Sequence, residues 1–193
     1  MKFILGVDEA GRGPLAGPVV VGVIAVADGY DLLAAFPGLN DSKKLSEKKR
    51  EALFQLLQKE MHAGNVRASV QLVGATYIDQ GGIAPAIRHA VARGIEKLLP
   101  NPHEGKVFLD GSLKAPAEYA QETVVGGDGI VPAIMLASIA AKVTRDKHME
   151  MLAKEYPAYG FEKHKGYGTK AHIEAIRTFG PCIEHRRSFL TRI

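Results

Sequence analysis

The sequence predicts an α/β protein with one sizeable core and a C-terminal appendage. Short β-branched, apolar runs bounded by glycine and proline recur along the chain and are typical of strands. Longer segments with apolar residues at helical spacing lie between these runs. With 193 residues, of which 46% are hydrophobic, the chain is long enough to bury such a core and too apolar to remain disordered.

Three strands are expected in the first part of the chain, at residues 3–7, 18–27 and 66–73. The first two are continuous apolar runs, and the third alternates between apolar and polar residues. Between the second and third strands, apolar residues recur at helical spacing over residues 53–61, and Ser46 stands where its side chain can cap this helix.

The remaining chain predicts three helices and two strands. A helix is expected over residues 83–98, because apolar residues recur there with helical period and Pro100 ends the run. Pro132 is suited to the first turn of a long helix, and Thr169 to the cap of a short one. The other elements are expected as strand 107–109, strand 122–125, helix 132–154 and helix 169–178.

The formal net charge of +4 hides an uneven distribution. Up to Ala141 the chain has 14 basic and 15 acidic side chains, whereas the rest of the chain has 11 basic and 6 acidic ones. A basic segment is suited to following a phosphate backbone. The cations expected to do so are Lys142, Arg145, Lys163, Lys165, Arg186 and Arg187.

Cysteine content and hydropathy exclude several classes of protein. The single cysteine, Cys182, excludes an internal disulfide and any multi-cysteine metal site, which fits a reducing compartment. The apolar stretch before Asp8 is too short for a signal peptide, and the longest charge-free windows, 13–27 and 129–141, are shorter than a membrane-spanning helix. We therefore expect a cytoplasmic protein that does not insert into a membrane.

Four acidic residues stand at the ends of expected strands or just before the long helix. They are Asp8, Glu9, Asp110 and Asp128, and each is followed closely by glycine. Converging carboxylates repel one another unless they are protonated or bridged by a cation. Oxygen ligands without cysteine favour Mg²⁺ or Mn²⁺, and paired ions are a common arrangement for phosphodiester hydrolysis. Taken singly, each residue is more typical of an ordinary turn or helix start than of a metal site.

One point of geometry limits this metal site. Successive residues of a strand face opposite sides, so Asp8 and Glu9 can share a site only where the strand ends or twists. Ala10 and Gly11 follow directly and predict such an end. The glycine-rich run 11–17 has neither the dinucleotide-binding nor the P-loop spacing, but its glycines permit close approach of the backbone to a ligand.

Six segments together resemble ribonuclease HII. They are VDEAGRGPLAGPVV at 7–20, DSKKL at 41–45, FLDG at 108–111, ASIAAKVTRD at 137–146, HKGYGT at 164–169 and HRRSF at 185–189. The resemblance spans nearly the whole chain. It implies a ribonuclease H-like fold, in which helices flank a five-stranded mixed sheet and a C-terminal helical extension follows, and it implies hydrolysis of RNA within RNA–DNA duplexes.

The resemblance also implies roles for individual residues. Four residues match the family's metal-binding carboxylates: Asp8, Glu9, Asp110 and Asp128. The resemblance implies hydrolysis with two divalent ions, which leaves products with 3′-hydroxyl and 5′-phosphate ends. The matching substrate contacts are Gly11, Arg12 and Gly13 at the ribose 2′-hydroxyl, Ser42 and Lys43 at phosphates, and Tyr167 on the neighbouring deoxyribose.

This set of contacts implies incision on the 5′ side of a single ribonucleotide embedded in duplex DNA, and hence ribonucleotide removal in replication and repair. One departure from the family pattern concerns Gly127 and Gly129, which flank Asp128 where the resemblance implies bulkier or hydroxyl-bearing residues. We expect these glycines to loosen the position of the fourth ligand.

We expect residues 1–141 to form the catalytic core and residues 142–193 a basic substrate-binding extension of the same structural unit. The expected state is a monomer, with RNA–DNA hybrid and ribonucleotide-containing duplex DNA as partners. Two alternatives remain open. One is another nuclease of this fold, such as ribonuclease HIII or a junction resolvase, and the other is a non-catalytic nucleic-acid-binding module. Metal-dependent cleavage of a duplex with one ribonucleotide separates the three.

Overall fold

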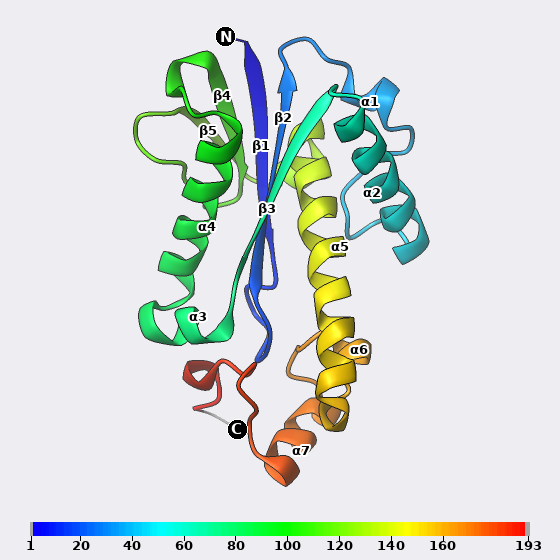
Figure 1. Ribbon diagram of the computed structural model, residues 1–193, viewed down its shortest axis with the longest axis vertical. Helices are drawn as coiled ribbons and strands as arrows, with labels where there is room; N and C mark the ends of the chain where they lie inside the picture. The colour runs from blue at the N-terminus through cyan, green and yellow to red at the C-terminus, as the bar shows by residue number, and fades with distance from the viewer. Residues whose placement is uncertain (1, 192–193) are drawn as a thin grey trace.

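A central five-stranded sheet with helices on both sides forms the body of the molecule (Figure 1). The computed structural model describes residues 2–191. Across the sheet the strand order is β3-β2-β1-β4-β5. The strands are β1 (Phe3–Ala10), β2 (Val19–Ala27), β3 (Val66–Val73), β4 (Gly105–Asp110) and β5 (Ala120–Val124).

Strand β1 lies at the centre of the sheet. It pairs antiparallel with β2, where Asp8 faces Gly22, and parallel with β4, where Val7 faces Leu109. The β2–β3 pair is antiparallel and the β4–β5 pair is parallel, so the sheet is mixed as predicted. Because β1 and β4 run in the same direction, Asp8 and Asp110 follow paired residues toward the same edge of the sheet.

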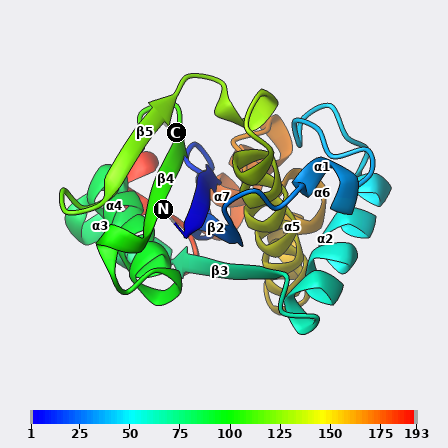
Figure 2. The same ribbon diagram turned by 90° about the horizontal axis from the view of Figure 1, so that it is seen from above.

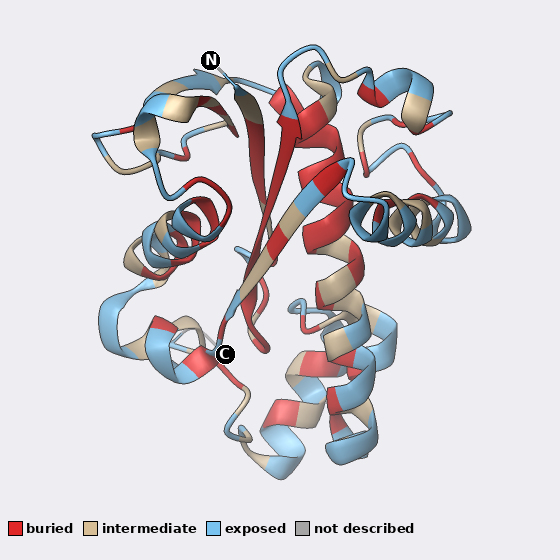
Figure 3. Ribbon diagram, turned by 45° about the horizontal axis from the view of Figure 1, so that its top comes forward, coloured by how far each residue is buried: buried red, intermediate tan, exposed pale blue. Residues whose placement is uncertain are grey.

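Two helical layers cover the sheet (Figure 2). Helix α4 packs on β2 and β3 from one face, and α5 lies along β1 and β2 on the other face, flanked by α1 and α2. The buried residues follow β1, β2 and the sheet-facing side of α5 (Figure 3). The helices are α1 (Leu32–Ala35), α2 (Glu47–His62), α3 (Ala75–Gly81), α4 (Ile83–Leu98), α5 (Pro132–Glu155), α6 (Phe161–His164) and α7 (Lys170–Phe179).

Two glycines bring α5 very close to the sheet. A Cβ at Gly6 would lie 2.1 Å from the carbonyl carbon of Ala133, and a Cβ at Gly22 would lie 2.3 Å from the carbonyl oxygen of Ala137. Both distances are well inside van der Waals contact, so a larger residue would push the helix away. The close approach carries Ser138 of α5 to the end of β1, where Asp8 stands.

Helices α6 and α7 gather around the C-terminal half of α5. Their small core includes Met149, Phe161 and Ile176, and Ala16 joins it from the loop between β1 and β2. Ala16 also forms an isolated antiparallel bridge with His185. The C-terminal segment is therefore tied directly to the glycine-rich loop. The division into residues 1–141 and 142–193 stays a prediction, and α5 runs without interruption across that boundary.

The long elements agree with the sequence predictions within about two residues, and the Ser46 side chain caps α2 by accepting from the Lys49 N–H at 3.3 Å. Strand β1 is the exception, because residues 8–10 continue to pair with β2 beyond the predicted end. The prediction missed α1, α3 and α6, which have seven residues or fewer. Helices this short contain too few turns for an apolar period to show.

Candidate active site

Three aspartates converge near the carboxyl-terminal ends of the parallel strands β1 and β4. Asp8 lies on β1, Asp110 is the last residue of β4, and Asp128 lies in a short 3₁₀ turn (Gly127–Gly129) before α5. Carboxylate oxygens of the three lie within 4.8 Å of one another. Oxygen-only ligands at this spacing are those of a divalent-metal site.

The protein environment strongly raises the pKa of Asp8. Burial raises its pKa to about 7, from an ordinary value of 3.8, and the nearby charges of Glu9 and Asp110 raise it as well. Hydrogen bonds from the Ser138 side chain and from the Glu9 N–H, the latter at 2.7 Å, act in the opposite direction without cancelling the shift. A cation beside Asp8 would supply the stabilisation that the ionised carboxylate lacks.

Asp128 is held in place from both sides. Its backbone N–H donates to Oδ1 of Asp110 at 3.3 Å, and Nζ of Lys43 donates to its Oδ2 at 2.8 Å. The turn is also tightly packed at Gly127, where a Cβ would lie 2.6 Å from Cδ1 of Ile134 and 3.4 Å from Oδ1 of Asp110. The absent side chain at Gly127 lets the turn close onto β4, whereas a Cβ at Gly129 would meet nothing within 4 Å, so the expectation that these glycines loosen the ligand stays a prediction.

Glu9 does not belong to the three-aspartate cluster. Because β1 stays paired through Ala10, Glu9 and Asp8 alternate in direction along the strand, which ends directly before Gly11 as predicted. Glu9 nevertheless lines the same cavity as Asp8 and Asp110, and its Oε1 accepts from Nη1 of Arg12 at 3.4 Å. Burial raises the pKa of Glu9, and the Arg12 charge opposes that shift.

The glycine loop after β1 forms one wall of this cavity. Gly11 has a φ of +85°, and a Cβ there would lie 2.0 Å from Nε of Arg145, so the position demands glycine. Gly13 has open space where its Cβ would stand, and it lines the cavity together with Gly11 and Arg12. A ligand can therefore reach the backbone of the loop directly.

Two buried arginines hold the loop from behind. Arg145 donates to the carbonyl oxygens of Pro18 at 3.0 Å and Ala16 at 3.2 Å. Arg186 donates to the carbonyl oxygens of Gly17 at 3.0 Å, Arg12 at 3.0 Å and Gly11 at 2.7 Å. Burial lowers the pKa of Arg186 to about 10, and the charge of Arg145 adds to this effect, but the guanidinium remains charged at neutral pH.

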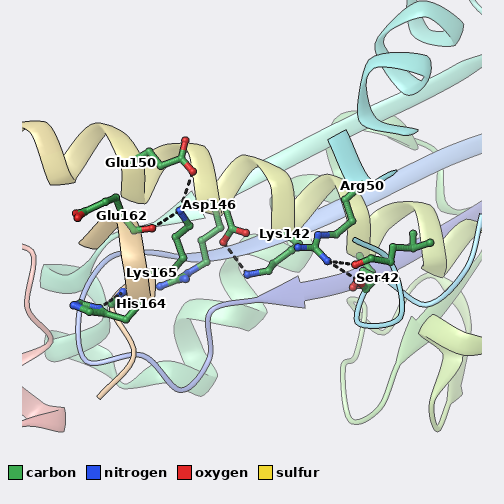
Figure 4. A network of polar contacts seen from close by, with 12 residues as sticks. Ser42, Arg50, Lys142, Asp146, Glu150, Glu162, His164 and Lys165 are labelled. Carbon is green, nitrogen blue, oxygen red and sulfur yellow. Dashed lines mark hydrogen bonds and ion pairs between the residues drawn. The ribbon is translucent and has the colours of Figure 1, made fainter. Parts of the chain in front are cut away.

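The turn that carries Ser42 and Lys43 closes the cavity beside α5. The Ser42 hydroxyl lies 2.8 Å from the Ser138 hydroxyl, and Nη1 of Arg50 donates to the Ser42 carbonyl oxygen at 3.0 Å. Figure 4 shows Arg50 reaching from α2 to this turn, with Lys142 paired to Asp146 farther along α5. Ser42 is buried against α5, whereas the Lys43 side chain is exposed except at its contact with Asp128.

Tyr167 stands on the other side of the same cavity. Its ring is about half exposed, and the Arg145 guanidinium carbon lies 5.8 Å from the ring centroid. The carbonyl oxygen of Tyr167 is 2.9 Å from Nδ1 of the buried His172, which fixes the turn from below. The cavity has a volume of about 310 Å³, and each residue that the resemblance implied as a substrate contact lines it.

The whole chain is similar to one family of nucleases. The sequence model described as Ribonuclease HII matches residues 5–192. A Ribonuclease HII of Geobacillus sp. (strain WCH70) is 46% identical over 190 residues, which are 98% of this chain and 64% of the relative. A Ribonuclease HII of Endomicrobium trichonymphae is 47% identical over 187 residues, which are 96% of this chain and 84% of the relative. The chain belongs to the ribonuclease HII family.

Solved structures confirm the ribonuclease H-like fold that the family implies. A chain of the PCNA:RNase HII complex from Archaeoglobus fulgidus is 25% identical, and the match covers 95% of this chain and 93% of that chain with a TM-score of 0.77. Bst-RNase HIII in complex with Mn²⁺ has a TM-score of 0.68 over 97% of this chain and 64% of that chain. At 17% identity, the latter match shows the shared fold alone.

The structure corrects one expectation about the basic C-terminal segment of this family member. Arg145 and Arg186 are 1% and 0% exposed, so neither can follow a phosphate backbone on the surface. Both instead shape the glycine loop. Lys142, by contrast, lines the cavity beside Ser138, and Lys165 donates to Glu150 at 2.8 Å on the outer side of α5 (Figure 4).

Sequence reasoning named Lys142 and Arg145 of α5 as phosphate contacts but missed Ser138 on the same face of the helix. Ser138, Lys142 and Arg145 all line the cavity, and Ser138 links the Ser42 turn to Asp8. These residues are spaced by four and three positions, which places them on one side of a helix. A polar residue in the apolar first half of α5, in line with the two cations, was the signal that could have identified Ser138. Within residues 2–191, no helix is both long and apolar enough to cross a membrane.

Proposed function

We propose that this chain is an endoribonuclease that hydrolyses the RNA strand of RNA–DNA hybrids and incises on the 5′ side of single ribonucleotides in duplex DNA. The observation that carries the proposal is the meeting of Asp8 and Asp110 with the glycine loop 11–13 in one cavity. Carboxylates that can bind divalent ions therefore lie next to a backbone segment that can contact the 2′-hydroxyl of a ribose. The cellular role that follows is removal of ribonucleotides during DNA replication and repair.

The carboxylate cluster fits Mg²⁺ or Mn²⁺. Asp8, Asp110 and Asp128 would hold the metal through oxygens that lie within 4.8 Å of one another, with Glu9 as a fourth ligand from the adjoining wall. The raised pKa of the buried Asp8 supports this fit, because an ionised carboxylate there requires a nearby positive charge. Two such ions, when bound, activate water and stabilise the leaving 3′ oxygen.

The chain's own residues bind and orient the substrate around that cluster. The open backbone at Gly13 lets the 2′-hydroxyl of a ribose approach the loop, and a 2′-hydroxyl is what distinguishes RNA from DNA at one position. Tyr167 offers a half-exposed ring to the neighbouring deoxyribose, and Lys43 offers an exposed ammonium to a phosphate. No serine, cysteine or histidine has to form a covalent intermediate in this scheme.

Two readings compete with this proposal, and one assay separates them. The assay uses three end-labelled duplexes: one with a single ribonucleotide in DNA, one with a longer RNA run, and one of DNA alone. Each is incubated with Mg²⁺, with Mn²⁺ and with EDTA. The expected result is metal-dependent incision of the first two, with a cut on the 5′ side of the single ribonucleotide and product ends that carry 3′-hydroxyl and 5′-phosphate groups.

Other outcomes identify the competing readings. Cleavage confined to the RNA run would indicate a nuclease of the same fold with the substrate choice of ribonuclease HIII. Binding of all three duplexes without metal-dependent incision would indicate a non-catalytic nucleic-acid-binding module. We further propose that the chain acts in the cytoplasm and that it acts as a monomer. Sedimentation of the protein with and without the single-ribonucleotide duplex tests the oligomeric state.

A further inference from the structure

A second cavity adjoins the active site on the opposite side of the sheet from α5. It has a volume of about 260 Å³ and lies between α4 and the loop that follows β4. Arg12 of the glycine loop lines both this cavity and the active-site cavity, so the two are neighbours across one side chain. Figures 1 and 2 show α4 and α5 on opposite faces of the sheet.

The charges of this second cavity are all of one sign. Arg12, Arg88 and Lys114 line it, and no acidic side chain does so. Arg88 and Lys114 are exposed, and within residues 2–191 neither has a carboxylate within 4.0 Å. Arg12 is shared with Glu9 at 3.4 Å. Two cations without an ion pair among the described residues therefore line a groove that shares Arg12 with the active-site cavity.

The floor and walls of the cavity are rigid. Ile87 and Val91 of α4 and Leu113 of the loop form the floor, and all three are buried in the core between α4 and the sheet. Hydrogen bonds fix the loop on both sides of Lys114. The Leu113 N–H donates to the Asp110 carbonyl oxygen at 3.1 Å, and the Ala115 N–H donates to the Gln121 side chain at 2.9 Å.

We propose that this basic groove, defined by Arg12, Arg88 and Lys114, binds the sugar-phosphate backbone of the substrate as it leaves the active site on the α4 side. The inference rests on the proposed function. A strand that continues past the carboxylate cluster meets Arg12 first and then the other two cations, with its sugars over the apolar floor. A small free anion would contact the cations but not the apolar floor. Its binding would also not require that Arg12 lines both cavities.

Removal of two charges from the groove tests the proposal. The variant Arg88→Gln/Lys114→Gln leaves the active-site cavity and Arg12 intact, and neither side chain forms an ion pair within residues 2–191. A matched control, Arg93→Gln/Lys97→Gln, removes the same charge from exposed positions of α4 outside the groove. Binding of a fluorescent single-ribonucleotide duplex is measured by anisotropy in EDTA, so that no cleavage occurs.

The expected result is a smaller salt dependence for the groove variant alone. Each lost phosphate contact lowers the slope of log affinity against log salt by about 0.9. Loss of two contacts therefore lowers it by about 1.8, so that a fourfold rise in salt weakens wild-type binding roughly 12-fold more than variant binding. An unchanged slope, or an equal change in the control, would overturn the proposal.

The position of the contact is tested with two shortened duplexes, one cut back on the 5′ side of the ribonucleotide and one on the 3′ side. We expect one truncation to remove the difference between wild type and the groove variant, because the groove lies on one side of the active site. A difference that persists in both would overturn the assignment to a continuing strand. Incision by the wild type with Mg²⁺ is measured in parallel, and its absence would refute the proposed function instead.

Discussion

The substitution Asp8→Asn is expected to stabilise the metal-free protein at pH 8 while it abolishes metal-dependent cleavage. Burial, with help from the charges of Glu9 and Asp110, raises the pKa of Asp8 from 3.8 to about 7. A difference of about three pKa units corresponds to about 4 kcal/mol in the free energy of unfolding. The folded protein is destabilised by this amount when the carboxylate ionises. Asparagine has nearly the same shape and no charge, and it still accepts the hydrogen bond from the Glu9 N–H.

The sign of the pH dependence follows from the direction of the shift. Between about pH 4 and pH 7 the folded state retains the Asp8 proton that the unfolded chain has released, so stability from this group falls as the pH rises through that window. The increase in the free energy of unfolding on Asp8→Asn therefore reaches its full value above pH 7. At pH 5 it is about a third of that value, since only the first part of the window has been crossed.

Thermal unfolding in EDTA at pH 5 and pH 8 measures this effect. For a chain of this size, about 4 kcal/mol corresponds to a rise of roughly 8–16 °C at pH 8. Mg²⁺ should raise the melting temperature of the wild type at pH 8 and leave that of the variant nearly unchanged. Asp28→Asn, the same change at an exposed turn, is the control. A variant that melts at or below the wild-type temperature at pH 8, or that gains equally at pH 5, would refute the reasoning.

Four further substitutions probe the site. Asp110→Asn should nearly abolish cleavage with an unchanged circular dichroism spectrum, and full activity would remove Asp110 from the metal site. Tyr167→Ala should slow incision at a single ribonucleotide more than cleavage within an RNA run; equal losses would contradict a role at the junction. Gly127→Ala should cost about 1–3 kcal/mol in urea unfolding and lower kcat, because its Cβ meets Ile134, and the double variant with Ile134→Ala should lose less free energy of unfolding than the sum of the two single losses. Arg186→Lys should lower the free energy of unfolding by about 2–4 kcal/mol, since an ammonium cannot replace a guanidinium that bonds three carbonyl groups, and a loss below about 0.5 kcal/mol would argue against the loop-holding role.

Local patterns were sufficient for the main elements and for the acidic cluster. The Ser46 cap, the glycine and proline boundaries and the apolar periods are encoded within a few residues, and the long elements appear where those patterns stand. Asp8 and Asp110 could be predicted because a carboxylate that follows an apolar strand segment is easily recognised in the sequence, and Asp128 because it lies in a glycine-rich turn just before a long helix. Glu9 could not be placed in the same way, since its direction depends on how far β1 remains paired with β2.

The sequence by itself determined the family, the order of the strands and the longer helices, and the candidate metal ligands. Only the tertiary structure decided what the basic residues do. Arg186 bonds the carbonyl oxygen of Gly11, which is 175 positions away, and Arg145 bonds that of Ala16 across 129 positions. No local pattern distinguishes such a buried arginine from an exposed one like Arg88. The difference arises when distant backbone carbonyls meet a guanidinium and satisfy its donors in place of water.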